Sequence, residues 1–255
     1  MIDSVYYITR SQGMELVSKY HYSKVMPRIT KRYVGGFEGK KLVAVMTLGW
    51  GVRPLHTIQK LFPSLTTKDY LEIGKMCVAD EMPKNSVSHF TSKVIALIKK
   101  DMPQVKILFS WADGIMGKAG YVYQASNFFY GGYIWTNAFL DKDNVRIHRR
   151  TLQGINSTKK NTKGSIAFDV ITKQGYRMLF GKQFRYVFPL CDKREWKKLL
   201  KESEFKWTRG DYPKNKDIEF FIKDKDGKRK LDSIEMNTTI HTKENKMLKN
   251  QIKLF

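Results

Sequence analysis

One stretch constrains the fold of this chain more than any other: residues 107–130, ILFSWADGIMGKAGYVYQASNFFY. It opens with a short apolar run typical of a buried strand, reaches an acid at Asp113 and then passes glycines at positions 114, 117 and 120. Open α/β sheets bind ligands where a strand ends in such a turn. We therefore expect a functional site here, lined by Asp113 and by three polar residues of the next segment: Tyr123, Gln124 and Asn127.

Hydrophobic periodicity elsewhere predicts strands and helices in alternation. The expected strands are Val5–Thr9, Tyr33–Glu38, Lys41–Thr47, Tyr70–Val78, Val105–Trp111, Phe129–Ala138 and Arg185–Pro189. The expected helices are Gln12–Tyr20 with Ser11 as N-cap, Val87–Lys100 with Ser86 as N-cap, Gly120–Phe128, and Lys193–Lys201. This order predicts a mixed α/β fold with antiparallel strands first and one crossover later.

The turn Ala79–Ser86 leads into the second of these helices and offers a candidate phosphate site. Free backbone N–H groups and the positive dipole end of a helix suit a pyrophosphate. Hydroxyl groups and cations that could assist are those of Ser86, Ser88, Lys75 and Lys84. The alternative is that the serine before this helix acts only as a cap.

Positive charge is concentrated in the middle of the chain. The formal net charge is +23, and residues 142–214 hold 19 basic against 7 acidic side chains. Lysine and arginine gain by displacing counterions from phosphates, so this block indicates a polyanionic partner, which we take to be DNA. Membranes are not indicated, because no basic amphipathic helix of the membrane-surface type stands out. A solvated lysine-rich surface is the other interpretation.

The sequence shows no sign of export or of a disulfide framework. Cys77 and Cys191 are far apart and lack CxxC spacing. The N-terminal residues do not form a signal pattern, and no apolar run approaches the 18 residues of a membrane span. We expect a soluble cytoplasmic protein.

The order of hairpin, long strand, helix and splayed strand resembles the GNAT (N-acetyltransferase) fold. That resemblance implies a mostly antiparallel mixed sheet flanked by helices, and an acyl-coenzyme A such as acetyl-CoA bound at the helix that begins near Ser86. The glycine-containing pyrophosphate loop of that superfamily is absent, and the residues in its place include Asp80 and Glu81.

A more specific resemblance is to the phage Mom DNA-modification family, over residues 14 to 136. The residues that carry it are His21-Tyr22, Lys75, Pro83-Lys84-Asn85 with Ser88, Trp111-Ala112-Asp113, and Tyr123-Gln124-Ala125-Ser126-Asn127. The chain departs from the family pattern at Lys75, where arginine is favoured, and at Gly114, where proline is favoured. Lysine cannot make the bidentate contact of an arginine.

The resemblance implies transfer of a methylcarbamoyl-type group to the exocyclic amine of adenine in DNA, which blocks restriction enzymes. It also implies an iron ion held by Tyr22 and Asp113, and a place in the host cytoplasm for a phage-encoded protein. The catalytic set that it suggests is Asp113, Tyr22, His21, Tyr123 and Ser88, and the cofactor-binding set is Lys75, Ser86, Ser88, Lys84 and Asn127.

The proposed chemistry has its own requirements. The adenine amine is a poor nucleophile, so a base such as Asp113 or His21 must remove its proton. The adenine must also leave the duplex and stack on an aromatic face, for which the candidates are Tyr22, Tyr123, Phe128 and Trp135. An amide, Gln124 or Asn127, could read its edge. Phosphate contacts are expected from the basic strip that includes Arg149, Arg150, Lys159 and Lys160.

We expect three parts: a GNAT-like catalytic core at 1–140, a basic DNA-contacting continuation of the same domain at 141–214, and a charged C-terminal appendage at 215–255. A homodimer is a further expectation. Two other functions stay open. One is a GNAT-type acyl- or aminoacyl-transferase acting on a protein or a small amine, and the other is a basic nucleic-acid-binding protein without catalysis. Asp113 could also be only a turn acid, and Tyr123 with Asn127 a solvated helix face joined by a hydrogen bond.

Overall fold

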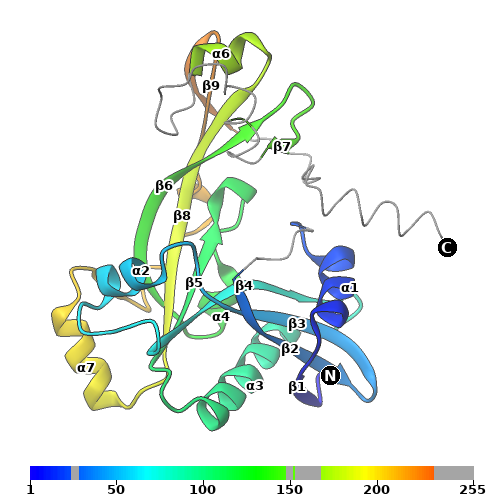
Figure 1. Cartoon of the computed structure of the whole chain (residues 1–255), viewed down its shortest axis with the longest axis vertical. Helices are drawn as coiled ribbons and strands as arrows, with labels where there is room; N and C mark the ends of the chain where they lie inside the picture. The colour runs from blue at the N-terminus through cyan, green and yellow to red at the C-terminus, as the bar shows by residue number, and fades with distance from the viewer. Residues whose placement is uncertain (24–28, 148–151, 153–167, 233–255) are drawn as a thin grey trace.

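The computed structural model describes residues 1–23, 29–147, 152 and 168–232, in which ten strands form one sheet (Figure 1). The strands are β1 (Ser4–Tyr7), β2 (Thr30–Glu38), β3 (Lys41–Gly49), β4 (Tyr70–Val78), β5 (Ile107–Asp113), β6 (Phe129–Leu140), β7 (Arg146–Ile147), β8 (Arg177–Pro189), β9 (Phe220–Asp224) and β10 (Gly227–Leu231). The helices are α1 (Arg10–Tyr20), α2 (Pro54–Leu61), α3 (Ser86–Asp101), α4 (Tyr121–Ala125), α6 (Phe168–Lys173) and α7 (Lys193–Glu202), with short 3-10 turns η1 (Gly114–Met116) and η2 (Asn215–Asp217).

The sheet has the order β1-β2-β3-β4-β5-β8-β6-β7, and β9 joins β8 to β10. Its pairs are antiparallel except for β4 and β5, which run parallel because α3 carries the chain back across the sheet. The expected mixed, mostly antiparallel sheet flanked by helices is therefore confirmed, and its hairpin, crossover and splayed strand follow the GNAT-like order.

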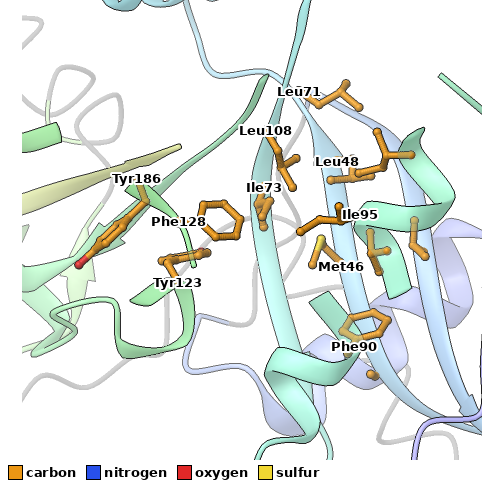
Figure 2. Close-up of a cluster of buried hydrophobic side chains, with 14 of the residues drawn as sticks. Met46, Leu48, Leu71, Ile73, Phe90, Ile95, Leu108, Tyr123, Phe128 and Tyr186 are labelled. Carbon is orange, nitrogen blue, oxygen red and sulfur yellow. The ribbon is translucent and has the colours of Figure 1, made fainter. Parts of the chain in front are cut away.

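Helices cover both faces of the sheet. α1 packs against β3 and β4 through a small cluster that contains Leu16, Val17, Val45 and Cys77. α3 covers the opposite face, where Phe90, Val94 and Ile98 join the largest core cluster. Figure 2 shows this core as one continuous layer, from Met46 and Phe90 through Ile73 to Tyr123 and Tyr186. The site described below therefore lies in a sheet that is held on both sides.

Two helix starts differ from the prediction. The N-cap of α1 is Thr9, not Ser11, because the Thr9 hydroxyl accepts the Gln12 backbone N–H and the Gln12 side chain accepts the Thr9 backbone N–H. At α3 the cap is Asn85, in a left-handed conformation (φ 71°), and Ser86 is the first helical residue. Asparagine tolerates that conformation better than most residues. The prediction looked for a serine cap and therefore missed it.

Two element lengths also differ. The expected helix Gly120–Phe128 is only the short α4, because Asn127 adopts a left-handed conformation (φ 60°) that turns the chain into β6. The expected strand Arg185–Pro189 is the end of the 13-residue β8. The Gly181 position and the polar residues within β8 interrupt the apolar alternation on which the prediction depended.

Candidate active site

The parallel strands β4 and β5 separate halfway along their length. Their pairing covers Tyr70–Ile73 and Ile107–Ser110, after which β4 follows β3 and β5 follows β8 as far as the pair of Asp113 with Gln183. The two strands run apart in Figure 1 and leave a fork in the middle of the sheet. We call this the β4–β5 fork.

A bulge in β4 places two ionisable side chains on one face of the fork. Opposite β3, Thr47 pairs with Lys75 and Leu48 with Ile73, so Gly74 has no partner residue. The extra residue shifts the alternation by one position. Glu72 and Lys75 therefore share a face, whereas Ile73 and Met76 pack into the core on the other side.

Lys75 is a buried cation on this face. Its Nζ donates to the carbonyl oxygen of Ser23 at 2.9 Å, and its backbone N–H donates to Thr47 Oγ1 at 2.8 Å. Burial lowers the pKa of Lys75 to about 8, with Arg146 acting in the same direction and Cys77 and Asp113 opposing. A neutral amine is therefore accessible near neutral pH.

Asp113 ends β5 on the other arm of the fork, and its side chain is only 18% exposed. Burial raises its pKa, while Arg146 (3.7 Å), the N–H groups of Ile115 and Met116, and Lys75 pull it back. Gly114 is required next to it, because a Cβ at that position would lie 2.4 Å from the carbonyl oxygen of Lys182. This contact explains why a glycine follows the acid in this chain.

Tyr22 and His21 approach the same space from the end of α1. Their rings stack with centroids 4.3 Å apart, and His21 Nδ1 lies 2.9 Å from the backbone nitrogen of Ser23. Burial raises the pKa of the Tyr22 phenol, and the charges of Asp113 and Tyr123 raise it further. Tyr22 thus lies close to Asp113 and Tyr123. The structure brings these three predicted catalytic side chains together with a fourth, His21.

Tyr123 lies at the vertex of the fork. Its hydroxyl is 2.7 Å from Ser110 Oγ on β5, and its ring packs on Phe128 and Tyr186 (Figure 2). Burial raises the pKa of Tyr123 to about 12, with Glu72 acting in the same direction and the Ser110 hydrogen bond opposing. The alternative of a solvated helix face shared with Asn127 is wrong, because Tyr123 is buried and Asn127 has left the helix.

Sequence reasoning missed two charged residues at this site, Glu72 and Arg146. Burial raises the pKa of the Glu72 carboxyl to about 7, although the backbone N–H of Gly51 stabilises its charge. Arg146 reaches Asp113 from β7. The signal for Glu72 was a single acid within the apolar strand YLEIGKMCV, whereas nothing local marked Arg146.

A hollow of about 480 Å³ lies on the α3 side of the sheet, between the start of α3 and the end of α4. Its walls include four of the five predicted cofactor-binding residues: Lys84, Ser86, Ser88 and Asn127. The fifth, Lys75, lies instead with Asp113 at the fork. Ser88 is thereby also separated from the rest of the predicted catalytic set, and its hydroxyl donates to the carbonyl oxygen of Asn85 at 2.9 Å.

Two polar atoms in the wall of this hollow are buried without a hydrogen-bond partner, Ser86 Oγ and His89 Nδ1. Glu81, in the preceding turn, is held by Lys41 at 3.0 Å and by the Tyr20 hydroxyl at 3.2 Å. One of the two acids that replace the glycine loop is therefore neutralised by an ion pair. A hydroxyl without a partner at a helix start fits a phosphate-bearing cofactor.

Several predicted contacts are not placed for their proposed role. The Gln124 amide nitrogen lies 3.0 Å from the Tyr186 hydroxyl and 2.9 Å from the Pro213 carbonyl oxygen, so reading a base would break these bonds. Phe128 is fully buried and cannot stack on a base without repacking. The strip of Arg149, Arg150, Lys159 and Lys160 lies outside the described residues.

The described residues do not form a suitable iron site. Tyr22 and Asp113 are neighbours, but no group of three His, Cys, Asp or Glu side chains occurs among the residues that the structure describes. Lys75 and Arg146 already supply positive charge to Asp113. A metal ion would meet repulsion from both cations, so the implied iron ligation by Tyr22 and Asp113 is not supported, and we derive no step from it.

The profile of the Mom protein family matches residues 4–214 of the chain. The chain belongs to the Mom protein family. A relative, the methylcarbamoylase mom of Escherichia phage Mu, is 31% identical over 141 residues, which are 55% of this chain and 57% of that protein. The match thus spans little more than half the length of the relative.

The solved structures to which the chain is similar include N-acetyltransferases. One from Staphylococcus aureus Mu50 has a TM-score of 0.39 at 13% identity and covers 75% of this chain and 99% of its own. An acetyltransferase from Bacillus subtilis in complex with CoA has a TM-score of 0.37 at 12% identity and covers 74% and 99%. In the described part of this chain, no helix has the length and apolar content to cross a membrane.

Proposed function

We propose that this Mom family member is a transferase that attaches an acyl-type, methylcarbamoyl-like group to the exocyclic amine of adenine in DNA and so protects the DNA from restriction. Family membership and the Mu relative support the reaction class. The observation that carries the proposal is the β4–β5 fork with its acid–cation cluster and with Tyr123 at its vertex, together with a polar hollow at the start of α3.

The hollow beside α3 is the proposed donor site. The α3 N–H groups, the Ser86 hydroxyl and Lys84 would hold the phosphates of an acyl-coenzyme A, and His89 and Asn127 line the same wall. A donor bound there supplies the acyl group. A hollow of this size is also within the usual range for cofactor sites.

The fork supplies the proton chemistry. Asp113 would accept the proton that the adenine amine loses as its nitrogen bonds to the acyl carbon, and Arg146 and Lys75 stabilise the ionised carboxylate. Tyr123 would donate its proton to the leaving group as the bond to the acyl carbon breaks. Its raised pKa keeps the phenol protonated until that moment. Tyr22 offers an aromatic face beside Asp113.

Mass spectrometry of nucleosides tests the proposal directly. The chain is expressed in bacteria, plasmid DNA is digested to nucleosides, and a deoxyadenosine of higher mass is sought. We expect the adduct with the natural chain and its loss with Asp113→Ala. Asp211→Ala, which removes an exposed acid, is the matched control and should keep the adduct.

Two results would refute the proposal. An adduct of unchanged abundance in a folded Asp113→Ala variant would remove the site. Acylation of a protein or small amine by the purified chain, with DNA unmodified, would favour the broader acyltransferase function instead.

A further inference from the structure

Strands β6 and β8 continue past the end of β5 as a long ribbon, which β9 and β10 widen (Figure 1). β5 occupies the edge of β8 from Gln183 onward, and β9 takes over the same edge from Met178 to Gly181. These four strands carry none of the side chains placed at the fork, although β7, which supplies Arg146, pairs with the outer end of β6.

The two faces of this outer sheet differ in how they are covered. One face is closed by η1, through an apolar cluster of Ile115, Ala138, Leu140, Leu179, Phe220 and Leu231. The other carries aromatic rings and lysines in cross-strand register, with Trp135 opposite Lys182 and Phe180 opposite Phe221. We call it the aromatic–lysine face: Tyr133, Trp135, Phe180, Phe221, Lys182 and Lys228.

Large rings on this face are open to solvent. Tyr133 is 45% exposed and Trp135 49% exposed, although a solvent-facing strand normally carries polar residues. Their ring centroids are 6.1 Å apart, and the Trp135 ring lies 5.6 Å from that of Phe221. The three rings meet edge to face, at interplanar angles of 89° and 65°, and form a row across the surface rather than a parallel stack.

Cations accompany each ring. Lys182 Nζ lies 4.8 Å from the Tyr133 ring centroid, and Lys228 Nζ lies 4.8 Å from that of Phe221. Lys230 pairs across strands with Phe221. Glu219 contacts both Lys182 (2.6 Å) and Lys230 (3.4 Å), so one carboxylate is shared by two of the three lysines and a positive excess remains.

We propose that the aromatic–lysine face binds single-stranded nucleic acid, with bases stacked on Tyr133, Trp135 and Phe221 and phosphates beside the lysines. Exposed rings accept any base through its flat face, and lysines follow the backbone. Bases inside a duplex are already stacked, so a duplex could use only the lysines. The choice of DNA over RNA rests on the proposed function. The inference that this face binds a single strand rests only on its own rings and lysines.

The face also lies apart from the reacting groups. Asp113 pairs across strands with Gln183, and the residues of the aromatic–lysine face on β8 alternate with Gln183 and so point to the opposite side. A nucleic-acid strand bound on this face is held away from Asp113, so the base that reacts must be a different one from those stacked here. Binding and catalysis can consequently be tested by different variants.

Fluorescence anisotropy of the full chain with labelled oligonucleotides of about 20 nucleotides tests the proposal. The probes are a single-stranded DNA, its duplex and an RNA of the same sequence. We expect tighter binding of the single strands, and Trp135→Ala should weaken it about tenfold, the usual cost of one stacking ring. Trp135→Phe should largely restore it.

The matched control is Tyr6→Ala, which removes a ring that is 61% exposed on β1 at the far edge of the sheet. It should leave the affinity unchanged. Lys228→Gln should reduce the slope of log Kd against log salt by about 0.7, the contribution of one phosphate contact to a single strand. Lys100→Gln, on the last turn of α3, should not change that slope.

Equal affinity of Trp135→Ala, Tyr6→Ala and the natural chain would overturn the proposal. The proposal would also be overturned if Trp135→Ala abolished self-association in sedimentation experiments while oligonucleotide binding stayed unchanged. The face would then be a contact between copies of the chain. Binding of RNA alone would support the surface but not DNA as its partner. If Trp135→Ala weakens binding while no adenine adduct ever forms, the inference stands and the proposed function fails.

Discussion

The two sides of the β4–β5 fork differ in how their polar groups are satisfied. At the fork, Lys75, Asp113 and Arg146 are buried or half-buried and compensate one another's charges, whereas burial favours the neutral form of Glu72. In the hollow beside α3, Ser86 Oγ and His89 Nδ1 are buried without a partner. A preassembled set of compensated charges suits proton transfer, whereas polar atoms without a partner suit the capture of a ligand that supplies the missing hydrogen bonds.

The largest effect is expected at the vertex that joins the two sides. Tyr123→Phe removes the proposed proton donor but keeps the ring that packs on Phe128 and Tyr186. Adduct formation should fall by about 10²–10⁴-fold, the usual contribution of a general acid, with coenzyme A affinity unchanged. Quantitative nucleoside mass spectrometry and calorimetry would measure the two.

The matched control is Tyr121→Phe, two residues away, where the tyrosine is 46% exposed. It should keep the adduct. A Tyr123→Phe variant as active as this control would show that the vertex takes no part in proton transfer.

A second prediction concerns the backbone beside Asp113. Gly114→Ala places a Cβ 2.4 Å from the Lys182 carbonyl oxygen, so the start of η1 must move away from β8. We expect a loss of about 3 kcal/mol in the free energy of unfolding, within the range for strong steric conflict. Gly210→Ala, whose Cβ would meet its nearest neighbour at 3.8 Å, should be nearly neutral. Chemical denaturation would compare them, and equal midpoints would contradict the close packing at Gly114.

The third prediction is a pH dependence that Glu72 introduces. Burial raises its pKa from the model-peptide range to about 7, so the folded chain holds this proton more tightly than the unfolded chain. Its contribution to stability is therefore full at acidic pH and is lost as pH rises from about 4.5 towards 7. Glu72→Gln should remove roughly 2–3 kcal/mol of this pH-dependent change.

Denaturation curves at pH 5 and pH 8 would show this difference. Asp80→Asn, in the exposed turn before α3, is the control and should keep the pH dependence of the natural chain. An identical pH profile for Glu72→Gln would mean that this carboxyl is solvated in the folded protein.

The smallest effect is expected in the hollow. Ser86→Ala removes a buried hydroxyl that has no partner, so the free energy of unfolding should stay the same or rise by about 1 kcal/mol. Coenzyme A affinity should fall several-fold, because the ligand loses a donor. Ser88→Ala, whose hydroxyl already binds Asn85, should weaken the ligand less. Isothermal titration would measure both, and the reverse ranking would move the phosphate site along the helix.

The sequence predicted the elements whose apolar pattern is continuous. The hairpin β2–β3, strand β4, helix α3 and the end of β5 at an acid were all readable, because their side chains alternate or recur in phase with one buried face. Family motifs also indicated Tyr22, Asp113 and Tyr123, and the structure places these three together at the fork.

The remaining features depend on long-range contacts. α4 ends at the left-handed Asn127, and β8 is long because it pairs with β5, β6 and β9. Neither feature has a signal in the local sequence. Arg146 reaches Asp113 only because β7 folds back on β6. Gln124 looked like a base-reading amide, yet its partners come from Tyr186 and Pro213, far along the chain.

The bulge at Gly74 has a consequence for how this site can vary. Gly74 is the extra residue, so without it Ile73 and Lys75 would be neighbours on opposite faces of β4, as they are now. Deleting Gly74 would therefore leave Lys75 opposite Thr47 and on the face of Glu72. A regular ladder that kept Gly74 would instead turn Lys75 towards the core and Met76 towards the fork. The bulge thus lets the strand gain or lose one codon here without moving its later side chains to the other face.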